Sequence, residues 1–444
     1  APNQLFLNQG PGANGVPAFK EVAAAAGVAS VDSSHSASFV DYDRDGDLDL
    51  FLLTNKVEDP QGFPSKERAP VAFDGTNWRM LEGMDRYYAL WKYDAKNSGV
   101  EPAGRPDLLF RNDGAGAGGV PVFKDVTKEA GISGRGDGLS ATWWDYNKDG
   151  WPDLFIGNDF LSEDRLWHNN GDGTFKNVLA QAAPHTCWFS MGADAGDLNN
   201  DLLPDFFLAD MSATTHYKSK TTMGAMGGTN LKRAVESSPP QYMRNTCLLG
   251  TGTGRFLEAA YMLGIASTDW TWAVKFGDYD HDAKQDVYLT NGVIRAMNHS
   301  DFVVDEASKA GSHQWDFYKN QTTRPEQHRA YRNEGDLHFH DSSEEWGLNR
   351  TAVTYGCAWG DLDADGDLDL VEVNLDEPPT LYRNNAAGRP KSNSVAFRFK
   401  GKSANTESIG ASVTVTSASG SQMRQLFPGS DRKSTRLNSS HANV

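Results

Sequence analysis

Aspartate recurs at fixed positions in five nine-residue segments of this sequence. In each segment Asp stands at positions 1, 5 and 9, and Asp or Asn stands at position 3. Oxygen ligands spaced two residues apart in a tight loop suit a hard cation such as Ca²⁺, and Gly at position 6 permits the positive φ of the turn. The segments are residues 41–49, 145–153, 197–205, 278–286 and 361–369. A single acidic turn is often merely solvated, but five in the same register predict a set of metal-binding loops.

The EF-hand is the obvious alternative, because its loop also carries alternating oxygen ligands. That loop needs a bidentate Glu at position 12 and a helix on each side. Position 12 is occupied here by Leu52, Ile156, Leu208, Leu289 and Glu372, so only one of the five fits. An apolar stretch of strand length, without helical periodicity, follows each segment. The loops are therefore expected to connect β-strands.

Each acidic loop belongs to a longer repeat in which four short strands are predicted. After the loop and its apolar strand come a strand with the pattern LxxN, a Gly-rich turn and a strand that contains Phe, as in residues 109–112 and 123–126. Such four-strand units are typical of propeller blades, which bury their faces against one another. The sequence thus predicts an all-β fold, a seven-bladed β-propeller with its calcium loops on one rim. Five blades are expected to be complete, with a partial first blade at the start of the chain and a partial last blade entered near residues 409–416.

Three long insertions make the repeats uneven, and all three fall between the second and third strands of a blade. They are residues 56–105, 212–245 and 293–328. In an up-and-down blade this places them on the rim opposite the acidic loops. Loops added to a rigid scaffold often carry binding, so we expect a protein or glycan partner there. Aromatic residues in these insertions, such as Trp78, Trp91 and Trp315, are alternatively explained as small cores within the loops.

The composition excludes several classes of partner. The chain has 42 Lys and Arg against 59 Asp and Glu, a net charge of −17, which argues against nucleic acid and anionic membrane surfaces. Its three cysteines form no CxxC pair, so a disulfide framework is not expected. No run approaches the ~18 apolar residues of a transmembrane segment.

The residues resemble a known group of proteins. The acidic loops before apolar strands are similar to FG-GAP/VCBS repeats, as in the integrin α-subunit propeller. The order of LxxN, Phe strand and acidic loop, followed by residues 409–415, resembles the ASPIC/UnbV family, which includes the cartilage acidic proteins. The resemblance implies a seven-bladed calcium propeller over residues 1–400 and the start of a truncated ASPIC/UnbV-like segment over residues 401–430. It also implies an extracellular, periplasmic or cell-surface location.

The same resemblance implies the metal ligands, with the backbone carbonyl at position 7 as a further ligand in each loop. The side-chain ligands would be Asp41, Asp43, Asp45, Asp49, Asp145, Asn147, Asp149, Asp153, Asp197, Asn199, Asp201, Asp205, Asp278, Asp280, Asp282, Asp286, Asp361, Asp363, Asp365 and Asp369. Leu202 and Ala283 replace the position-6 Gly. A side chain at positive φ costs roughly 1 kcal/mol or more, so the loops at 197–205 and 278–286 are expected to bind Ca²⁺ more weakly or not at all.

The C-terminal residues depart from the family pattern. Residues 431–441 resemble the forward translation of a common sequencing adaptor. We therefore expect residues 431–444 to be an assembly artefact and the chain to be a fragment cut at both ends.

Catalytic motifs are the remaining question. The sequence contains no HExxH, GxSxG or Walker motif. Residues 114–119 satisfy GxGxxG, but a strand rather than a helix is predicted after them, so the dinucleotide-binding context fails. The third insertion holds His299, His313 and His328 among acidic residues without a diagnostic spacing. We therefore expect no enzyme but an exported calcium-binding propeller that binds a protein or glycan, with structural calcium. The alternative is a polysaccharide-active enzyme with its site on the insertion-bearing rim.

Overall fold

The computed structural model is built almost entirely of β-strands, as predicted. It describes residues 2–12, 15–55, 71–85, 87–92, 98–159, 162–222, 228–295, 321–385, 394–397, 399–417, 420–427 and 435–438. The helices within these ranges are short: α1 (Ala23–Ala26), α2 (Leu179–Ala182), α3 (His216–Thr221), α4 (Gly228–Glu236) and the 3-10 turn η1 (Ala117–Gly119). None of these helices is long and apolar enough to cross a membrane.

Five antiparallel sheets follow one another along the chain, and we number them blades 1 to 5. Blade 1 contains β3 (Ser34–Val40), β4 (Asp49–Thr54), β9 (Leu108–Ala115) and β10 (Pro121–Asp125); blade 2 contains β11 (Gly138–Trp144), β12 (Asp153–Asn158), β13 (Arg165–Asn169) and β14 (Phe175–Asn177). Blade 3 contains β16 (Ala193–Gly196), β17 (Asp205–Leu208), β20 (Thr246–Gly250) and β21 (Phe256–Glu258). Blade 4 contains β22 (Asp269–Gly277), β23 (Asp286–Asn291), β25 (Arg329–Gly335) and β26 (His338–Asp341), with β18 (Met211–Ser212) beside β22. Among the described residues blade 5 has three strands, β28 (Thr354–Gly360), β29 (Asp369–Asn374) and β30 (Thr380–Tyr382).

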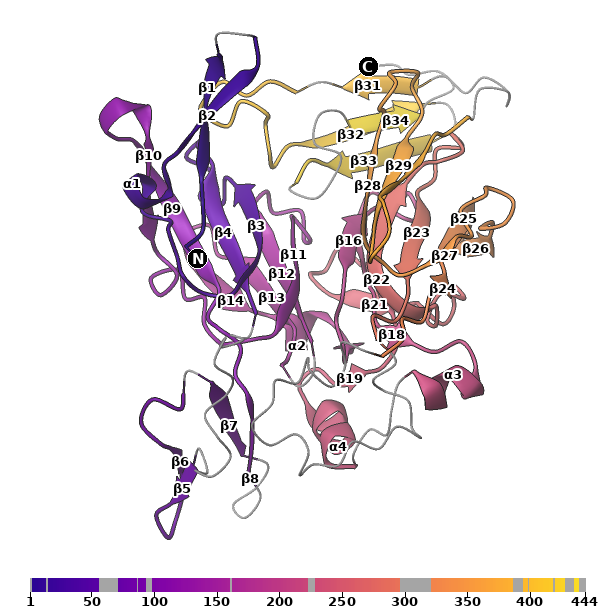
Figure 1. Cartoon of the computed structure of the whole chain (residues 1–444). Coiled ribbons are helices and arrows are strands. Elements are labelled where there is room, and N and C mark those ends of the chain that lie inside the picture. Colours follow the sequence, from indigo (N-terminus) through magenta and orange to yellow (C-terminus); the bar gives the residue numbers. More distant parts are fainter. Residues whose placement is uncertain are drawn as a thin grey trace.

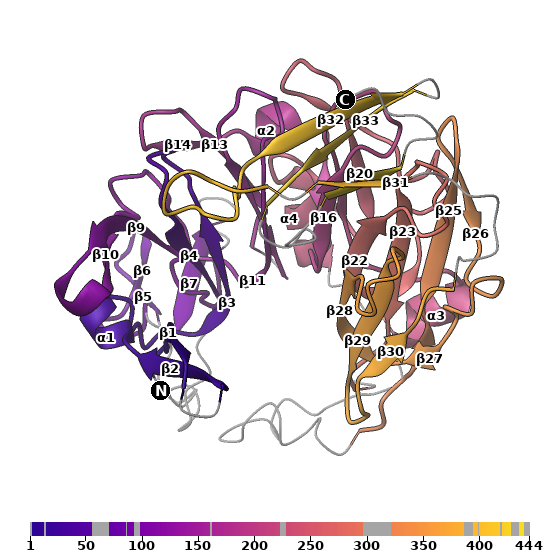
Figure 2. The same ribbon diagram turned by 90° about the horizontal axis from the view of Figure 1, so that it is seen from above.

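The blades are arranged around an arc, as in a propeller. Figure 2 shows this arc running from β1 (Phe6–Pro11) and β2 (Pro17–Glu21) to blade 5. The β1–β2 pair corresponds to the third and fourth strands of the predicted partial first blade. The predicted four-strand unit is confirmed in blades 1 to 4.

The core lies within and between the blades. All six residues of β4, β12 and β23 are buried, which explains why the second strand of these blades is nearly continuously apolar. Aromatic side chains fill the space between blades: Trp144 of blade 2 stacks on Phe206 of blade 3, with ring centroids 4.7 Å apart. Each sheet therefore buries its faces against its neighbours.

The acidic loops and the described parts of the insertions lie at opposite ends of the blades (Figure 1). The insertion end carries the hairpins β5 (Val71–Phe73) with β6 (Trp78–Met80) and β7 (Tyr88–Lys92) with β8 (Ser98–Pro102), together with α3 and α4. It also carries two further strand pairs, β15 (Thr186–Cys187) with β19 (Gln241–Tyr242) and β24 (Glu326–Gln327) with β27 (Thr351–Ala352). Residues 56–70, 93–97, 223–227 and 296–320 of the insertions lie outside the described residues.

The chain after blade 5 does not begin another blade, contrary to the prediction for residues 409–416. Strand β32 (Ser412–Ser417) instead pairs with β33 (Gly420–Gln425) in a hairpin that lies across the rim of the acidic loops (Figures 1 and 2). We call residues 399–417 and 420–427 the crossing segment. The hairpin is held on this rim by burial of its apolar side chains. Met423, Leu426 and Phe427 are each no more than 5% exposed, and Phe427 joins the core of blades 1 to 3.

A last strand pair lies beyond this hairpin in the sequence. Strand β31 (Ser394–Phe397) pairs antiparallel with β34 (Thr435–Asn438). Strand β34 falls within residues 431–444, whose assignment as an artefact stays a prediction.

Candidate metal-binding loops

We number the five acidic loops as loops 1 to 5, in the order 41–49, 145–153, 197–205, 278–286 and 361–369. Each loop joins the first strand of a blade to the second. Two residues in every loop have positive φ, the one at position 4 and the one at position 6: Arg44 and Gly46, Lys148 and Gly150, Asn200 and Leu202, His281 and Ala283, Ala364 and Gly366. Leu202 and Ala283 thus adopt the conformation that the sequence predicted to be strained, with φ of 70° and 78°. The positive φ at position 4 escaped prediction because the residue type there varies.

The carboxylates at positions 1, 3 and 5 come together in loops 1, 4 and 5. Their oxygen atoms lie within 4.8 Å of one another in each group: Asp41, Asp43 and Asp45; Asp278, Asp280 and Asp282; Asp361, Asp363 and Asp365. Three convergent carboxylates form the donor set that a hard divalent cation prefers. The carboxylates of these three loops therefore suit Ca²⁺, the cation predicted from the sequence.

Loops 2 and 3 differ because position 3 is Asn. The amide of Asn147 donates to Asp149 at 2.8 Å, and that of Asn199 donates to Asp201 at 3.0 Å. The amide nitrogen thus faces the position-5 carboxylate in both loops. To serve as a ligand, each amide would have to turn its oxygen inward.

The aspartate at position 9 lies apart from the three-carboxylate groups and holds the base of the loop. A backbone N–H from position 2 of the loop donates to the position-9 carboxylate in every loop, and so does a second N–H from the third strand or, in blade 5, from Asn384 just after it. The accepting residues are Asp49, Asp153, Asp205, Asp286 and Asp369. These side chains are at most 2% exposed. Burial raises the pKa of Asp49 and of Asp205 to about 8 in each case. The position-9 aspartates therefore have a structural role, which is to hold the base of each loop to its blade.

The Asn of the LxxN pattern connects consecutive blades, a role that the sequence analysis did not assign. Asn169 of blade 2 donates to the carbonyl of Tyr42 in loop 1 at 2.8 Å. Asn333 of blade 4 donates to Leu198 in loop 3 at 2.7 Å, and Asn384 of blade 5 donates to Tyr279 in loop 4 at 2.9 Å. The available signal was the recurrence of Asn at this position in blades 1, 2, 4 and 5, whereas blade 3 has Gly250 there.

The loops differ in the cationic side chains that form ion pairs with their carboxylates. In loop 4, Arg332 contacts Asp280 at 2.7 Å and Lys284 contacts Asp282 at 2.5 Å. In loop 5, Arg383 contacts both Asp363, at 2.8 Å, and Asp365, at 3.2 Å.

Loop 1 is the opposite case. Its carboxylates form no ion pair with any described cation, and burial followed by repulsion from Asp45 raises the pKa of Asp47 to about 6. The Arg111 guanidinium acts on Asp43 through its charge without forming an ion pair with it.

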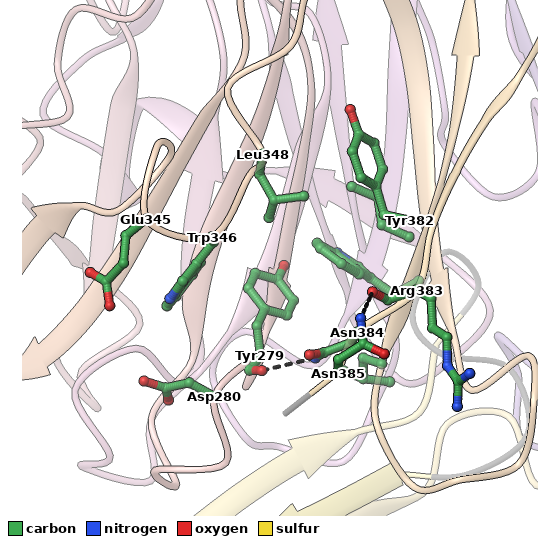
Figure 3. Close-up of a pocket in the computed structure, with 12 residues that line it drawn as sticks. Tyr279, Asp280, Glu345, Trp346, Leu348, Tyr382, Arg383, Asn384 and Asn385 are labelled. Carbon is green, nitrogen blue, oxygen red and sulfur yellow. Dashed lines mark hydrogen bonds between the residues drawn. The ribbon is translucent and has the colours of Figure 1, made fainter. Parts of the chain in front are cut away.

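A pocket of about 270 Å³ lies beside loop 4, at the contact between blades 4 and 5 (Figure 3). Tyr279, Trp346, Trp359 and Tyr382 form its aromatic lining. In earlier blades the loop tyrosine packs on a Phe of the next blade's fourth strand, with ring centroids 5.8 Å apart for Tyr42 and Phe175 and 5.7 Å apart for Tyr146 and Phe256. The pocket lies beside Tyr279, which contacts Trp359 instead, at 3.9 Å between ring centroids.

The alternative prediction, an enzyme with its site on the insertion rim, falls only partly within the described residues, because His299 and His313 lie outside them. Lys218 and Glu326, from two insertions, do meet near Asp269: the Lys218 Nζ lies 2.6 Å from Asp269 and 3.4 Å from Glu326. Both carboxylates also accept backbone N–H groups, from Thr214 and Trp270. His328 is fully buried, with Nδ1 3.0 Å from Glu372. The Lys218 group is thus held by protein partners, whereas His328 Nε2 and Glu372 Oε2 are buried without a hydrogen-bond partner among the described residues.

Residues 145–208, which include loops 2 and 3, match the FG-GAP-like repeat family. No curated protein matches the chain. Similar solved structures include an Agrocybe aegerita lectin that recognises non-reducing terminal N-acetylglucosamine (14% identity, TM-score 0.31, 80% of this chain and 81% of that chain). Others are the rhamnogalacturonan lyase YesX (12%, 0.27, 92% and 74%) and the V. cholerae biofilm matrix protein Bap1 (12%, 0.27, 91% and 53%). The repeat match and the arrangement of blades support an FG-GAP β-propeller, and the resemblance to ASPIC/UnbV stays a prediction.

Proposed function

We propose that this protein is an exported calcium-binding β-propeller that acts as a scaffold for a protein or glycan partner, with calcium in a structural role. The observation that carries the proposal is the convergence of three carboxylates at the same positions of loops 1, 4 and 5. Up to five ions would bind, one in each loop, and loops 3 and 4 would bind more weakly because Leu202 and Ala283 have positive φ.

Bound calcium would offset the repulsion between carboxylates that the chain forces together. Positions 1, 3 and 5 would supply side-chain oxygens, and position 7 a backbone carbonyl. The aspartate at position 9 already fixes the loop to the third strand through backbone N–H groups. The loop base is therefore set by the protein, and the ion would order the loop tip.

The partner is proposed to bind at the insertion-bearing rim. The support is the concentration of added hairpins and helices at that end of the blades (Figure 1), on a scaffold that is otherwise made of repeated sheets. The natural ring is proposed to have seven blades, of which five and part of another are present in the arc of Figure 2.

Calcium binding to the metal-stripped chain tests the proposal, with isothermal titration calorimetry as the measurement. We expect saturable binding of Ca²⁺, with much weaker binding of Mg²⁺ because the smaller ion demands octahedral geometry. The variant Asp43→Asn/Asp45→Asn removes two carboxylate charges from loop 1 and should bind one ion fewer. The control variant Asp113→Asn/Asp125→Asn removes two charges from blade 1 outside the loops and should bind as many ions as the unmodified chain. Absence of calcium binding at millimolar concentration would refute the proposal.

A further inference from the structure

In loops 1 to 4, the side chain at position 4 contacts the acidic loop of the following blade. This position lies between the proposed ligands at positions 3 and 5, and its backbone has positive φ in each loop. The residues themselves differ in size and charge: Arg44, Lys148, Asn200 and His281. What they share is therefore their place in the loop and not their chemistry.

Two of the four contacts are hydrogen bonds to a backbone carbonyl at position 6. Lys148 of loop 2 donates from Nζ to Leu202 O of loop 3 at 2.9 Å. Asn200 of loop 3 donates from its side-chain amide to Ala283 O of loop 4 at 3.1 Å. Each hydrogen bond thus holds the backbone one residue before position 7, whose carbonyl is the further proposed ligand.

The other two contacts are made to the side chain at position 7. The Arg44 guanidinium of loop 1 lies over the Trp151 ring of loop 2, 5.3 Å from its centroid. His281 Nε2 of loop 4 lies 2.8 Å from the Asp367 carboxylate of loop 5. Consecutive loops are thus connected in series, from loop 1 to loop 5, through one position of the repeat.

The two ends of this series fit the same pattern. Loop 5 has Ala364 at position 4, and a methyl group can neither donate a hydrogen bond nor carry a charge. At loop 1 the crossing segment takes the place of a preceding loop, because the Asn405 N–H donates to Gly46 O, the position-6 carbonyl, at 2.8 Å. The position-6 carbonyl is therefore an acceptor in loops 1, 3 and 4.

A contact of this kind links the order of one loop tip to that of the next. With an ion bound, the ligands at positions 3 and 5 would hold the position-4 backbone in place and keep its side chain against the following loop. That loop would then lose less conformational freedom when it binds its own ion. The effect must be reciprocal, since a coupling free energy between two sites acts equally on both.

We propose that position 4 is a positioning residue that couples calcium binding in adjacent loops, so that the rim takes up its ions cooperatively rather than as independent sites. This inference rests on the proposed calcium function. It assigns a role to four residues that are not themselves proposed ligands: Arg44, Lys148, Asn200 and His281.

Loop 2 allows binding in a single loop to be followed. The indole of Trp151, at position 7, would sensitise the luminescence of Tb³⁺, a probe ion close to Ca²⁺ in size, and loss of the signal in Trp151→Phe assigns it to this loop. Asp43→Asn/Asp45→Asn, which disables loop 1, is expected to weaken Tb³⁺ binding in loop 2 about two- to fivefold, the range that an exposed cation–π contact allows. In the Arg44→Gly background the same two substitutions should have no effect on loop 2.

Equal effects of the loop 1 substitutions with and without Arg44 would overturn the inference, because any coupling would then bypass position 4. No effect in either background would also overturn it. The calcium function would survive both results. Absence of any bound Tb³⁺ that excess Ca²⁺ displaces would instead overturn the calcium function, and the inference with it.

The hydrogen-bonded contacts are tested by the calcium-binding isotherm of the whole chain. Lys148→Gly/Asn200→Gly removes two of them and is expected to raise the midpoint in free Ca²⁺ by roughly two- to tenfold, with the same number of ions at saturation. Ala364→Gly is the matched control, because it makes the same backbone change at φ of 62° without removing a contact between loops; its midpoint should not rise. A midpoint of the double variant that is unchanged or lower, as relief of positive φ alone would give, would contradict the inference.

Discussion

At the scale of single residues, the loops depend as much on buried hydrogen bonds as on convergent carboxylates. Asn333 is 1% exposed and donates to two backbone carbonyls, those of Leu198 and Gln285. The first belongs to blade 3 and the second to blade 4, so one amide fixes the relative position of two loops. The sequence marked this residue as the Asn before a Gly-bearing turn, in the copy Tyr331-Arg332-Asn333, but its partner in the preceding blade became visible only in the fold.

Replacing Asn333 with Ala should destabilise the protein by about 1–3 kcal/mol, because two buried carbonyls lose their donor. Urea unfolding in saturating calcium measures this change. Asn385→Ala, at an exposed position next to the corresponding asparagine of blade 5, should change stability by less than about 0.5 kcal/mol. Equal effects of the two variants would show that the inter-blade hydrogen bond is energetically unimportant.

Asp164 gives a prediction about pH. It is 2% exposed and accepts hydrogen bonds from Asn158 N–H at 2.9 Å and from the Ser190 hydroxyl at 2.8 Å. Burial raises its pKa to about 7, from an ordinary value of 3.8. The folded state therefore binds the proton more tightly than the unfolded state, and the resulting stability is complete below pH 4 and is lost as pH rises through 7.

Between pH 5.5 and pH 8 this group alone should lower the free energy of unfolding by roughly 1–2 kcal/mol. Because other buried carboxylates titrate in the same window, the difference between the unmodified chain and Asp164→Asn is the informative quantity. The variant should have a flatter profile of unfolding free energy against pH. Parallel profiles would mean that the protonation state of Asp164 in the folded protein does not change between pH 5.5 and pH 8.

At the scale of the element, the acidic loop and its flanking strands were predictable because the repeat fixes them. Alternating oxygen residues followed by an apolar stretch give both the turn and the buried second strand, as in β12 and β23. The crossing segment was not predictable. Strands β32 and β33 have the composition of an ordinary blade strand, and only the burial of Met423 and Phe427 on a distant rim distinguishes their actual position.

Position 6 of the loop gives a reciprocal pair of substitutions. Gly150 has φ of 90°, and Gly150→Ala should destabilise loop 2 by roughly 1 kcal/mol or more because a side chain is disfavoured there. Ala283→Gly, at φ of 78° in loop 4, should be neutral or slightly stabilising. Thermal unfolding in calcium compares the two. Destabilisation of similar size by both substitutions would show that position 6 is governed by packing rather than by φ.

At the scale of the whole molecule, five blades with their acidic loops on one rim form an arc, in which acidic groups recur along one edge. The net charge of −17 is thereby partly concentrated in elements that the fold forces together. The sequence predicted this arrangement from repetition, but not that β32 and β33 pair with each other across the rim of the acidic loops. The position of the insertion rim was predictable, because the connections between the second and third strands of all blades lie at the same end of the sheets.

Thermal unfolding of the whole chain in excess Ca²⁺, in excess Mg²⁺ and in chelator tests the central claim most directly. A ligand bound only to the native state at 100 times its dissociation constant adds about 2.7 kcal/mol per site, so calcium in even two loops should raise the midpoint by several degrees. Magnesium should leave the midpoint near that in chelator. The same midpoint in all three conditions, for a chain that is folded at the start, would contradict the calcium-braced propeller.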